Sequence, residues 1–335
     1  MAAADPVRPQ VADVSLATIQ EPVQAELDAV FGELGRIIAA DIPLIGEVNR
    51  HLLRIKGKMF RPTLLLLSSQ ATGGTAPRDT TLAAVVELIH LATLIHDDSV
   101  DHSVLRRGQP TVNALFSHQI AVIMGDYMYS RAIVELVGLN DLEPLRVMGR
   151  VTNEMTVGEM REIEAHDVLD FTVEDYDALI DAKTASLMSG ACEVGALGGD
   201  PAHRKPLSRF GRCLGMAFQV VDDLLDYTST EEITGKPAGL DLREHKITLP
   251  LIAALPEMSG DERGAVESLM ESPEPTDRQI AAVMDHVERR GGLDAAQRRA
   301  QEFALLAEGE LESLPDSPAR DALRACITYV VERRR

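Results

Sequence analysis

The stretch Leu82–Asp101, LAAVVELIHLATLIHDDSVD, decides the fold class of this 335-residue chain. Its apolar residues recur every three or four positions, which is the period of a helix with a buried face. It closes with aspartates in the form Asp-Asp-x-x-Asp. Residues four apart share a face of a helix, so Asp97 and Asp101 should point the same way. The stretch therefore predicts a core helix that presents carboxylates at its C-terminal end.

A second stretch repeats this pattern, because the apolar segment Leu214–Val221 runs directly into Asp222-Asp223-x-x-Asp226. Like charges four residues apart destabilise a helix unless a cation lies between them. Oxygen ligands alone suit Mg²⁺, which also keeps waters and recruits phosphate oxygens. Solvated surface acids would explain a single box, but two matched boxes favour a shared metal site. The candidate metal ligands are Asp97, Asp98, Asp101, Asp222, Asp223 and Asp226.

The rest of the chain also reads as helical. Apolar residues at three- and four-residue spacing dominate the long segments, and strand-like alternation is hard to find. Gly and Pro pairs separate the segments, but no break is long enough to link two domains. We expect a frayed segment 1–15 and one all-α domain over 16–335, a helical bundle whose two aspartate boxes flank a central cavity. The expected helices include Val23–Leu34, Leu82–Leu94, Asn113–Ile123, Met128–Val137, Asp177–Leu197, Leu207–Asp226, Leu249–Ala254, Gln279–Val287 and Leu293–Leu311.

The composition limits the possible partners and location. A net charge of −20 argues against nucleic-acid binding, which needs a basic face. Neither a signal-peptide apolar region nor a run of about 18 apolar residues is visible. The three cysteines lie far apart, as expected for reduced core residues. We expect a soluble, cytoplasmic protein without stable membrane insertion, in which local cations attract any anionic substrate.

Cations cluster around the boxes. Arg106 and Arg107 follow the first box, and two guanidinium groups can hold a diphosphate through paired hydrogen bonds beside a metal. Lys58 and Arg61 stand at the start of another apolar helix, where backbone N–H groups also attract anions. Single surface cations would be unremarkable, but these pairs occur together with two acidic boxes. The combination predicts a diphosphate-binding site.

Polar residues also interrupt apolar helices. Lys183 is one of them, and a buried lysine needs a phosphate or a carboxylate as counter-charge. Lys236 and Lys246 add a basic rim near the second box. His90 lies two turns before Asp97, although a lone histidine on an apolar helix is more often a packed core residue than a ligand.

Several other chemistries find no support. Glu87-x-x-His90 matches half of a di-iron motif, but no second Glu-x-x-His occurs. Nucleotide-binding glycine loops, the Gly-x-Ser-x-Gly elbow and Cys-x-x-Cys pairs are also missing from the sequence. Nucleophilic, nucleotide-fold and zinc chemistry are therefore unsupported.

Taken together, these residues resemble the trans-isoprenyl diphosphate synthases, the polyprenyl synthetase family, from about Gly57 to Pro250. The resemblance implies an all-α fold and a Mg²⁺-dependent condensation of isopentenyl diphosphate with an allylic diphosphate. It also implies a homodimer. The matching pieces are Gly57-Lys58-x-x-Arg61-Pro62, His90, Asp97-Asp98-x-x-Asp101, Arg106-Arg107-Gly108, Gly125-Asp126, Lys183-Thr184, Phe218-Gln219-x-x-Asp222-Asp223-x-x-Asp226 and Gly235-Lys236-Pro237-x-Gly239-x-Asp241.

The resemblance also implies roles for individual residues. Both boxes would hold Mg²⁺ against the allylic diphosphate, with Arg106, Lys183 and Lys236 as further partners. The isopentenyl diphosphate would be bound by Lys58, Arg61, His90 and Arg107. Thr184 and Gln219 would line the allylic cation, and the departing diphosphate would accept the final proton.

The growing tail should run along the helix before the first box. Ala92 and Thr93 would meet it first, where short-chain members of the family often place a large aromatic side chain. One helical turn rises about 5.4 Å, close to one isoprene unit, so each open turn admits about one more unit. Tyr127, Met128 and Tyr129, after Gly125-Asp126, are candidates for the floor. We expect a long product, in the range of quinone side chains.

Three alternatives remain open. A short-chain farnesyl or geranylgeranyl diphosphate synthase would share every motif and differ only in the floor. A class I terpene cyclase would not need Lys58, Arg61 and Arg107, and it usually carries a different second box. A non-catalytic subunit of a heteromeric synthase typically lacks one or both boxes, whereas both are whole here.

Overall fold

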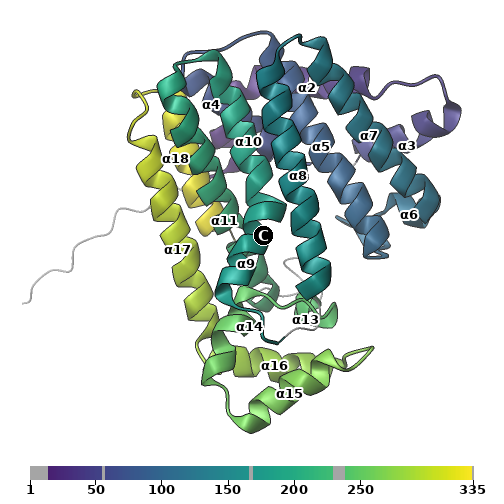
Figure 1. The fold of residues 1–335 in the computed structure, drawn as a ribbon, viewed down its shortest axis with the longest axis vertical. Helices are drawn as coiled ribbons and strands as arrows, with labels where there is room; N and C mark the ends of the chain where they lie inside the picture. Colours follow the sequence, from purple (N-terminus) through teal and green to yellow (C-terminus); the bar gives the residue numbers. More distant parts are fainter. Residues whose placement is uncertain (1–13, 55–56, 166–168, 229–237, 334–335) are drawn as a thin grey trace, which may run out of the picture.

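Long helices dominate the computed structural model, which describes residues 14–54, 57–165, 169–228 and 238–333. Figure 1 shows α5 (Arg78–Val100), α7 (His118–Gly138), α8 (Leu142–Ala165), α10 (Ser186–Gly195) and α11 (Arg204–Thr228) side by side along the length of the molecule. Helices α17 (Gly292–Leu311) and α18 (Pro318–Val331) lie on the flank away from α7. The prediction of an all-α fold is confirmed.

The helices are α1 (Leu16–Gln20), α2 (Gln24–Ile37), α3 (Pro43–Arg54), α4 (Phe60–Ala71), α5 (Arg78–Val100), α6 (Val112–Leu115), α7 (His118–Gly138), α8 (Leu142–Ala165), α9 (Val173–Ile180), α10 (Ser186–Gly195), α11 (Arg204–Thr228), α13 (Leu240–Arg243), α14 (Leu249–Ala254), α15 (Gly260–Met270), α16 (Asp277–Arg289), α17 (Gly292–Leu311) and α18 (Pro318–Val331). A π-helical turn, Asp181–Ala185, joins α9 to α10. The strands β1 (Leu105–Arg106) and β2 (Gln109–Pro110) form an antiparallel hairpin.

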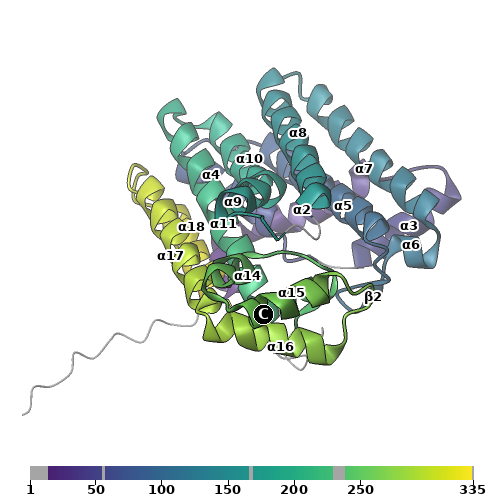
Figure 2. The same ribbon diagram turned by 60° about the horizontal axis from the view of Figure 1, so that its bottom comes forward.

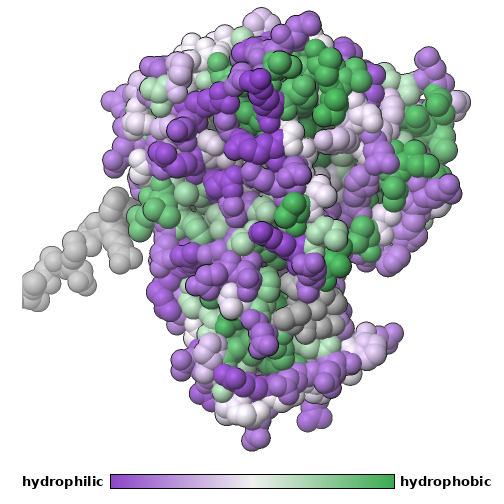
Figure 3. All heavy atoms as spheres, viewed as in Figure 1, coloured by the Kyte–Doolittle hydropathy of each residue, from purple (hydrophilic) through white to green (hydrophobic). Residues whose placement is uncertain are grey.

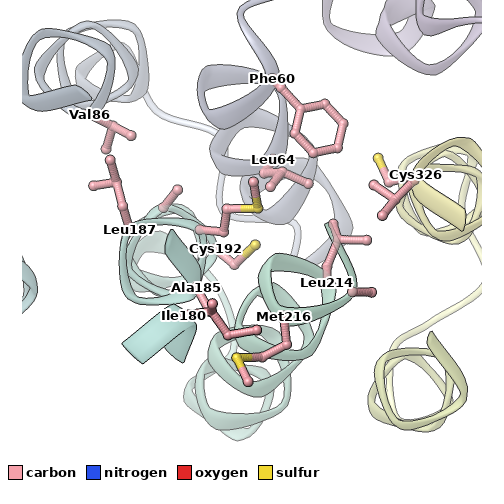
Figure 4. Close-up of a cluster of buried hydrophobic side chains, with 14 of the residues drawn as sticks. Phe60, Leu64, Val86, Ile180, Ala185, Leu187, Cys192, Leu214, Met216 and Cys326 are labelled. Atoms are coloured by element: carbon pink, nitrogen blue, oxygen red, sulfur yellow. The ribbon is translucent and has the colours of Figure 1, made fainter. Parts of the chain in front are cut away.

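The core is built around α10, whose residues are all buried. It packs against α4, α5, α8 and α11. Figure 4 shows Leu64 of α4, Val86 of α5, Leu187 of α10 and Leu214 of α11 within one apolar cluster. Gly195 lets α10 approach α4 closely, because a Cβ there would overlap the backbone carbonyl of Leu65. Packing against α10 therefore positions α5 and α11, the two helices that carry the aspartate boxes.

Helix α5 is long and apolar enough to cross a membrane by length and composition alone. However, 61% of its most apolar window is buried inside the protein, and α2, α4, α7 and α10 all pack against it. Its apolarity is therefore that of a core helix.

Helices α14, α15 and α16 lie together at one end of the molecule. Figure 2 shows α15 and α16 lying across the lower end of the bundle, beneath α14. The segment between α11 and α13 includes residues 229–237, so Lys236 lies outside the described residues. Residues 1–13 of the predicted N-terminal segment also lie outside them, whereas Ser15 caps α1 by accepting a hydrogen bond from the backbone of Thr18.

Some expected helix boundaries are wrong. The stretch Asn113–Ile123 is divided between α6 and α7, because Ser117 caps α7 by accepting a hydrogen bond from the backbone N–H of Ile120. Helix α7 then continues through Gly125 to Gly138 without a break. Helix α8 was not expected, since its sequence mixes charged and apolar residues along its exposed face.

Candidate active site

The first aspartate box ends α5. Asp101 is the C-terminal cap of the helix, and Asp98 is buried, with only 6% of its surface exposed. Arg106 donates to both Asp98 carboxylate oxygens through Nε, at 2.8 and 3.0 Å, and its Nη2 lies 2.7 Å from Oδ1. Adjacent positions of a helix diverge by about 100°. Asp98 therefore anchors Arg106, whereas Asp97 and Asp101 lie on the neighbouring face.

A two-residue hairpin turn positions the arginine pair. Arg107 and Gly108 both have positive φ, at 52° and 72°, which is typical of the type I′ turn that links two antiparallel strands. Arg106 and Gln109 are paired across this turn. The turn separates the two arginines, so that Arg106 reaches Asp98 and Arg107 reaches the neighbourhood of Glu87.

A buried polar cluster lies beside Arg107. Nη1 of Arg61 lies 3.0 Å from Nε2 of His90. A guanidinium can only donate, so this imidazole nitrogen must be the acceptor. Burial lowers the pKa of His90 well below its ordinary value, and Arg61 and Arg107 lower it further. His90 is therefore neutral, and it orients a cationic arginine.

Glu87 supplies the negative charge of this cluster. Its side chain is 6% exposed, and burial raises its pKa, while Arg61 and Arg107 oppose the rise. Burial likewise lowers the pKa of Arg61 to about 10, with Glu87 opposing the change. A Cβ at Gly57 would lie 3.3 Å from both Glu87 Oε1 and Arg107 Nη1. The loop before α4 therefore passes directly over this charged group.

Lys58 lies in the segment before α4, three residues before Arg61. Its Nζ lies 3.2 Å from the hydroxyl of Tyr329 and 5.8 Å from the ring centre. Phe60, two residues later, stacks on Phe218 of α11 with ring centres 6.3 Å apart. Lys58 is thus held against α18, and Phe60 fixes the start of α4 against α11, the helix that carries the second box.

The π-helical turn places Lys183 near the first box. Its Nζ pairs with Glu162 and lies 2.9 Å from Glu159, both on α8. Burial alone would lower the pKa of Lys183, but Glu162, Asp97 and Glu159 raise it. Burial raises the pKa of Asp97 to about 7, and Lys183 opposes this rise. Lys183 therefore has carboxylates as counter-charges, and it lies within electrostatic range of the first box.

The second box is held by neutral donors. Asp223 is 6% exposed and accepts hydrogen bonds from the hydroxyl of Tyr176 at 2.5 Å and from Nε2 of Gln219 at 2.8 Å. The amide oxygen of Gln219 accepts from the hydroxyl of Thr184 at 2.8 Å. Burial raises the pKa of Asp223 to about 7, against the effect of these hydrogen bonds.

The other two aspartates of the second box have different partners. Asp226 accepts hydrogen bonds from the backbone N–H groups of Leu240 and Asp241, at 3.1 and 3.0 Å, at the start of α13. Asp222, which is more exposed, pairs with Arg333, whose guanidinium lies 4.4 Å from the ring centre of Phe218.

The π-helical turn lies between the two boxes. Lys183 lies within electrostatic range of Asp97 of the first box, and the next residue, Thr184, is linked through Gln219 to Asp223 of the second. Burial lowers the pKa of Lys246, whereas Glu244, Glu162 and Asp241 raise it. Lys246 therefore lies within electrostatic range of carboxylates on both sides of this region. The structure thus links Lys183, Thr184 and Gln219 to the two boxes.

The carboxylates suit a divalent cation, although no three His, Cys, Asp or Glu side chains within the described residues form a complete metal site. Like charges act on both boxes: Asp101 raises the pKa of Asp97 after the larger effect of burial, and Asp222 and Asp226 do the same to Asp223. A divalent cation would relieve this repulsion. Mg²⁺ usually binds one or two carboxylates and completes its shell with water and phosphate. The residues present therefore fit such an ion.

The tail-length candidates differ in position. Ala92 is buried in α5, whereas Thr93 is partly exposed and bonds back to the carbonyl of His90. Met128 is fully buried in α7. The hydroxyl of Tyr127 reaches the carbonyls of residues 38 and 39, away from α8. The hydroxyl of Tyr129 instead lies 3.2 Å from Oγ1 of Thr152, and this hydrogen bond joins α7 to α8.

Sequence reasoning missed several neighbours of the site. Glu159 and Glu162 share a face of α8, but nothing in the sequence places that face opposite Lys183. Tyr176 lies one turn after Thr172, the N-cap of α9, and it shares a helix face with Val173 and Ile180, which indicates packing alone. Arg333 lies 111 positions from its partner Asp222, so no local pattern connects them.

An all-α bundle with two aspartate boxes and a basic turn between them defines a class of diphosphate-binding enzymes. Residues 42–287 match the family model described as polyprenyl synthetase. The chain belongs to the polyprenyl synthetase family and is a trans-prenyltransferase.

Individual relatives extend this result along nearly the whole chain. It is 38% identical to the all-trans-nonaprenyl-diphosphate synthase (geranyl-diphosphate specific) of Rhodobacter capsulatus, covering 91% of this chain and 94% of the relative. It is 36% identical to a short chain isoprenyl diphosphate synthase of Methanothermobacter thermautotrophicus, covering 86% and 90%. The polyprenyl synthase of Caulobacter crescentus, solved with calcium and isoprenyl diphosphate, superposes with a TM-score of 0.91 at 31% identity, covering 96% and 98%.

Proposed function

We propose that this enzyme condenses isopentenyl diphosphate with an allylic diphosphate to make a long all-trans polyprenyl diphosphate, with Mg²⁺ as its metal. The observation that carries the proposal is the π-helical turn, which places Lys183 within electrostatic range of Asp97 in the first box and links Thr184 through Gln219 to Asp223 in the second. One substrate diphosphate between the boxes would meet cations and metal-binding carboxylates together. We further propose that residues 16–335 act as one cytoplasmic unit.

The outward aspartates of each box would hold Mg²⁺, which when bound stabilises the negative charge that develops on the departing diphosphate. They are Asp97 and Asp101 in the first box and Asp222 and Asp226 in the second. Lys183 and Lys246 would bind the same diphosphate, and Lys236 would add to them. We assign Asp98 and Asp223, predicted as ligands, to inward anchoring because they are the buried aspartates of the two boxes, each 6% exposed, and protein donors hold them.

The second substrate, isopentenyl diphosphate, would bind to the buried cluster beside α4. Lys58, Arg61 and Arg107 would supply its cationic partners, with neutral His90 keeping Arg61 oriented. Ionisation of the allylic C–O bond leaves a carbocation, which the double bond of isopentenyl diphosphate attacks. The departing diphosphate then accepts the proton, so no protein nucleophile is needed.

A product assay tests this proposal directly. Purified protein, Mg²⁺, isopentenyl diphosphate and farnesyl diphosphate are incubated, and product lengths are read by mass spectrometry. We expect all-trans products with several added units. A stop after one unit would make the enzyme a short-chain synthase, whereas release of diphosphate without isopentenyl diphosphate would indicate a cyclase. Inactivity with every allylic primer would indicate a silent subunit.

A single substitution tests the tail path. Thr93→Phe places an aromatic ring one turn before Asp97, where the first added units should pass. We expect the longest product to shorten by several isoprene units, while the rate of the first condensation changes by less than about threefold, because the substitution lies behind the reacting atoms. Tyr129→Ala should act in the opposite direction by opening the link between α7 and α8. An unchanged product length in both variants would place the tail elsewhere.

We propose that the protein is a homodimer that buries the outer face of α7 and α8. Most of the large exposed apolar side chains among the described residues lie between Val100 and Ile163. Figure 3 shows apolar surface gathered on the side of the molecule where these helices lie. Val134 and Val137 are 55% and 58% exposed, and a patch of this kind marks a protein interface.

Light scattering after size-exclusion chromatography tests the assembly. The wild type should elute with twice the mass of one chain, and Val134→Asp with Val137→Asp should yield monomers. Leu305→Asp, which changes an apolar residue that is 70% exposed on α17, serves as the matched control and should leave the dimer intact. A monomeric wild type would contradict this part of the proposal.

A further inference from the structure

A continuous chain of hydrogen bonds crosses three elements beside the second box. The hydroxyl of Thr184 donates to the amide oxygen of Gln219, and the Gln219 amide nitrogen donates to Oδ1 of Asp223. The hydroxyl of Tyr176 donates to the other carboxylate oxygen, Oδ2, at 2.5 Å. Tyr176 is 1% exposed and lies on α9, outside both boxes.

The direction of this chain follows from its carboxylate. An ionised Asp223 can only accept, so the Gln219 amide nitrogen must face it, and the amide oxygen must face Thr184. The single hydroxyl proton of Thr184 is then committed to Gln219. The lone pairs of the Thr184 oxygen remain available to a positive charge, which is the polarity that an allylic cation requires.

Tyr176 fixes the other end of this chain. Without the phenol, Oδ2 of a buried carboxylate would lose its donor, and a buried acceptor without a partner carries a desolvation penalty. The carboxylate would turn toward another donor, and the hydrogen bond that orients Gln219 would be lost. The phenol therefore controls an amide on a different helix through one carboxylate.

We propose that Tyr176 is a positioning residue for prenyl transfer: by holding Asp223, it sets the orientation of Gln219 and directs the lone pairs of Thr184 toward the reacting carbon. This inference rests on the proposed function, in which Thr184 and Gln219 line the allylic cation. It adds a residue that never touches the substrate.

The first test removes only the hydroxyl. In Tyr176→Phe, the turnover number for one condensation should fall about 10- to 100-fold, while the KM for isopentenyl diphosphate changes less than about twofold. Tyr227→Phe is the matched control, because Tyr227 is also buried and its hydroxyl makes no hydrogen bond to Gln219 or Asp223 among the described residues. It should change turnover by less than about twofold.

The second test shows whether Tyr176 acts through Gln219. In a Gln219→Leu background, Tyr176→Phe should lower turnover by less than about twofold, since the group that it orients is gone. A merely structural tyrosine would lower turnover by the same factor in both backgrounds. Assays are run at a temperature where circular dichroism shows every variant folded, and Tyr176→Leu, which loses the ring as well, should match Tyr176→Phe in turnover.

Three results would overturn the inference: wild-type turnover in Tyr176→Phe, multiplicative losses in the double variant, or a change confined to the KM for isopentenyl diphosphate. Failure of the proposed function looks different, because the wild type itself would then form no elongated product.

Discussion

At the end of α5 a guanidinium holds the middle aspartate of the box, whereas at the end of α11 a phenol and an amide do. Asp98 and Asp223 have the same place in the motif and the same 6% exposure. Their partners differ in charge, because Arg106 neutralises Asp98 and the donors to Asp223 are neutral. Asp223 therefore has no cationic partner among its hydrogen-bond donors, and the charges of Asp222 and Asp226 add to the effect of burial in raising its pKa.

The aspartate motif therefore specifies geometry rather than electrostatics. Helix periodicity turns the first and last aspartates of each box to one face and the middle one inward. What neutralises the inward carboxylate is decided by elements far away in the chain. The first box is linked to the arginines of the hairpin, and the second is linked to the residues that would contact the carbocation.

The largest expected effect comes from the outward aspartates, where we expect the two boxes to behave alike. Asp97→Ala and Asp222→Ala should each lower turnover by on the order of 10³-fold, since each removes a carboxylate that would hold the metal. Steady-state assays across a Mg²⁺ titration measure the loss. If one variant keeps near-normal turnover, the two boxes are not equivalent even in their outward positions.

An intermediate effect should separate the inward aspartates. Asp98→Asn should lower the free energy of unfolding by about 1–3 kcal/mol, because it removes the negative charge that pairs with Arg106 in a partly buried site. Asp223→Asn should change it by less than about 1 kcal/mol, because the new amide oxygen still accepts from Tyr176, the Gln219 amide can turn so that its oxygen accepts from the new amide nitrogen, and burial no longer opposes a charge. Urea unfolding in EDTA measures both.

A double variant controls for side effects of the first substitution. Adding Arg106→Gln to Asp98→Asn should cost little more, since the pair is already broken. Equal losses in Asp98→Asn and Asp223→Asn would contradict the contrast between an ion pair and neutral donors.

A further expected effect is a pH dependence of the stability of the metal-free protein. Burial raises the pKa of Asp97 and of Asp223 from 3.8 to about 7. Between these values the folded state binds more protons than the unfolded state, so this contribution to stability is lost as the pH rises from about 4 to 7. A divalent cation added with inorganic diphosphate should restore the stability that is lost as the pH rises. It should therefore raise the melting temperature more at pH 8, where the carboxylates are ionised, than at pH 6.

Substituting each aspartate in turn shows how much of this pH dependence comes from each box. Asp97→Asn and Asp223→Asn should each flatten it in part, and both together should nearly remove it. Melting curves in EDTA at several pH values provide the measurement, and a stability that rises between pH 5 and 7 through these two positions would reverse the expected sign.

The helical fold and the positions of the boxes could be predicted from the sequence because both depend on local periodicity. Leu82–Asp101 contains its own helix signal and its own carboxylates, so no distant contact is needed to place them. The expected helix Leu207–Asp226 likewise lies within α11.

Other features depend on geometry that a single segment does not encode. The β1–β2 hairpin has strands of two residues each, too short for alternation to show, and its turn places an arginine at positive φ where asparagine or glycine is typical. The pairing of Lys183 with Glu159 depends on how α8 is oriented against the π-helical turn. The bond from Tyr176 to Asp223 spans 47 positions.

The π-helical turn Asp181–Ala185 has a consequence for rotational phase. In an uninterrupted α-helix, Tyr176 and Lys183 are seven residues apart and would emerge from nearly the same side. The wider turn introduces a phase offset between α9 and α10. The hydroxyl of Tyr176 can then reach Asp223 on α11, while the ammonium group of Lys183 reaches Glu159 on α8. A single-residue deletion there would restore the regular phase, and one of the two groups would lose its target.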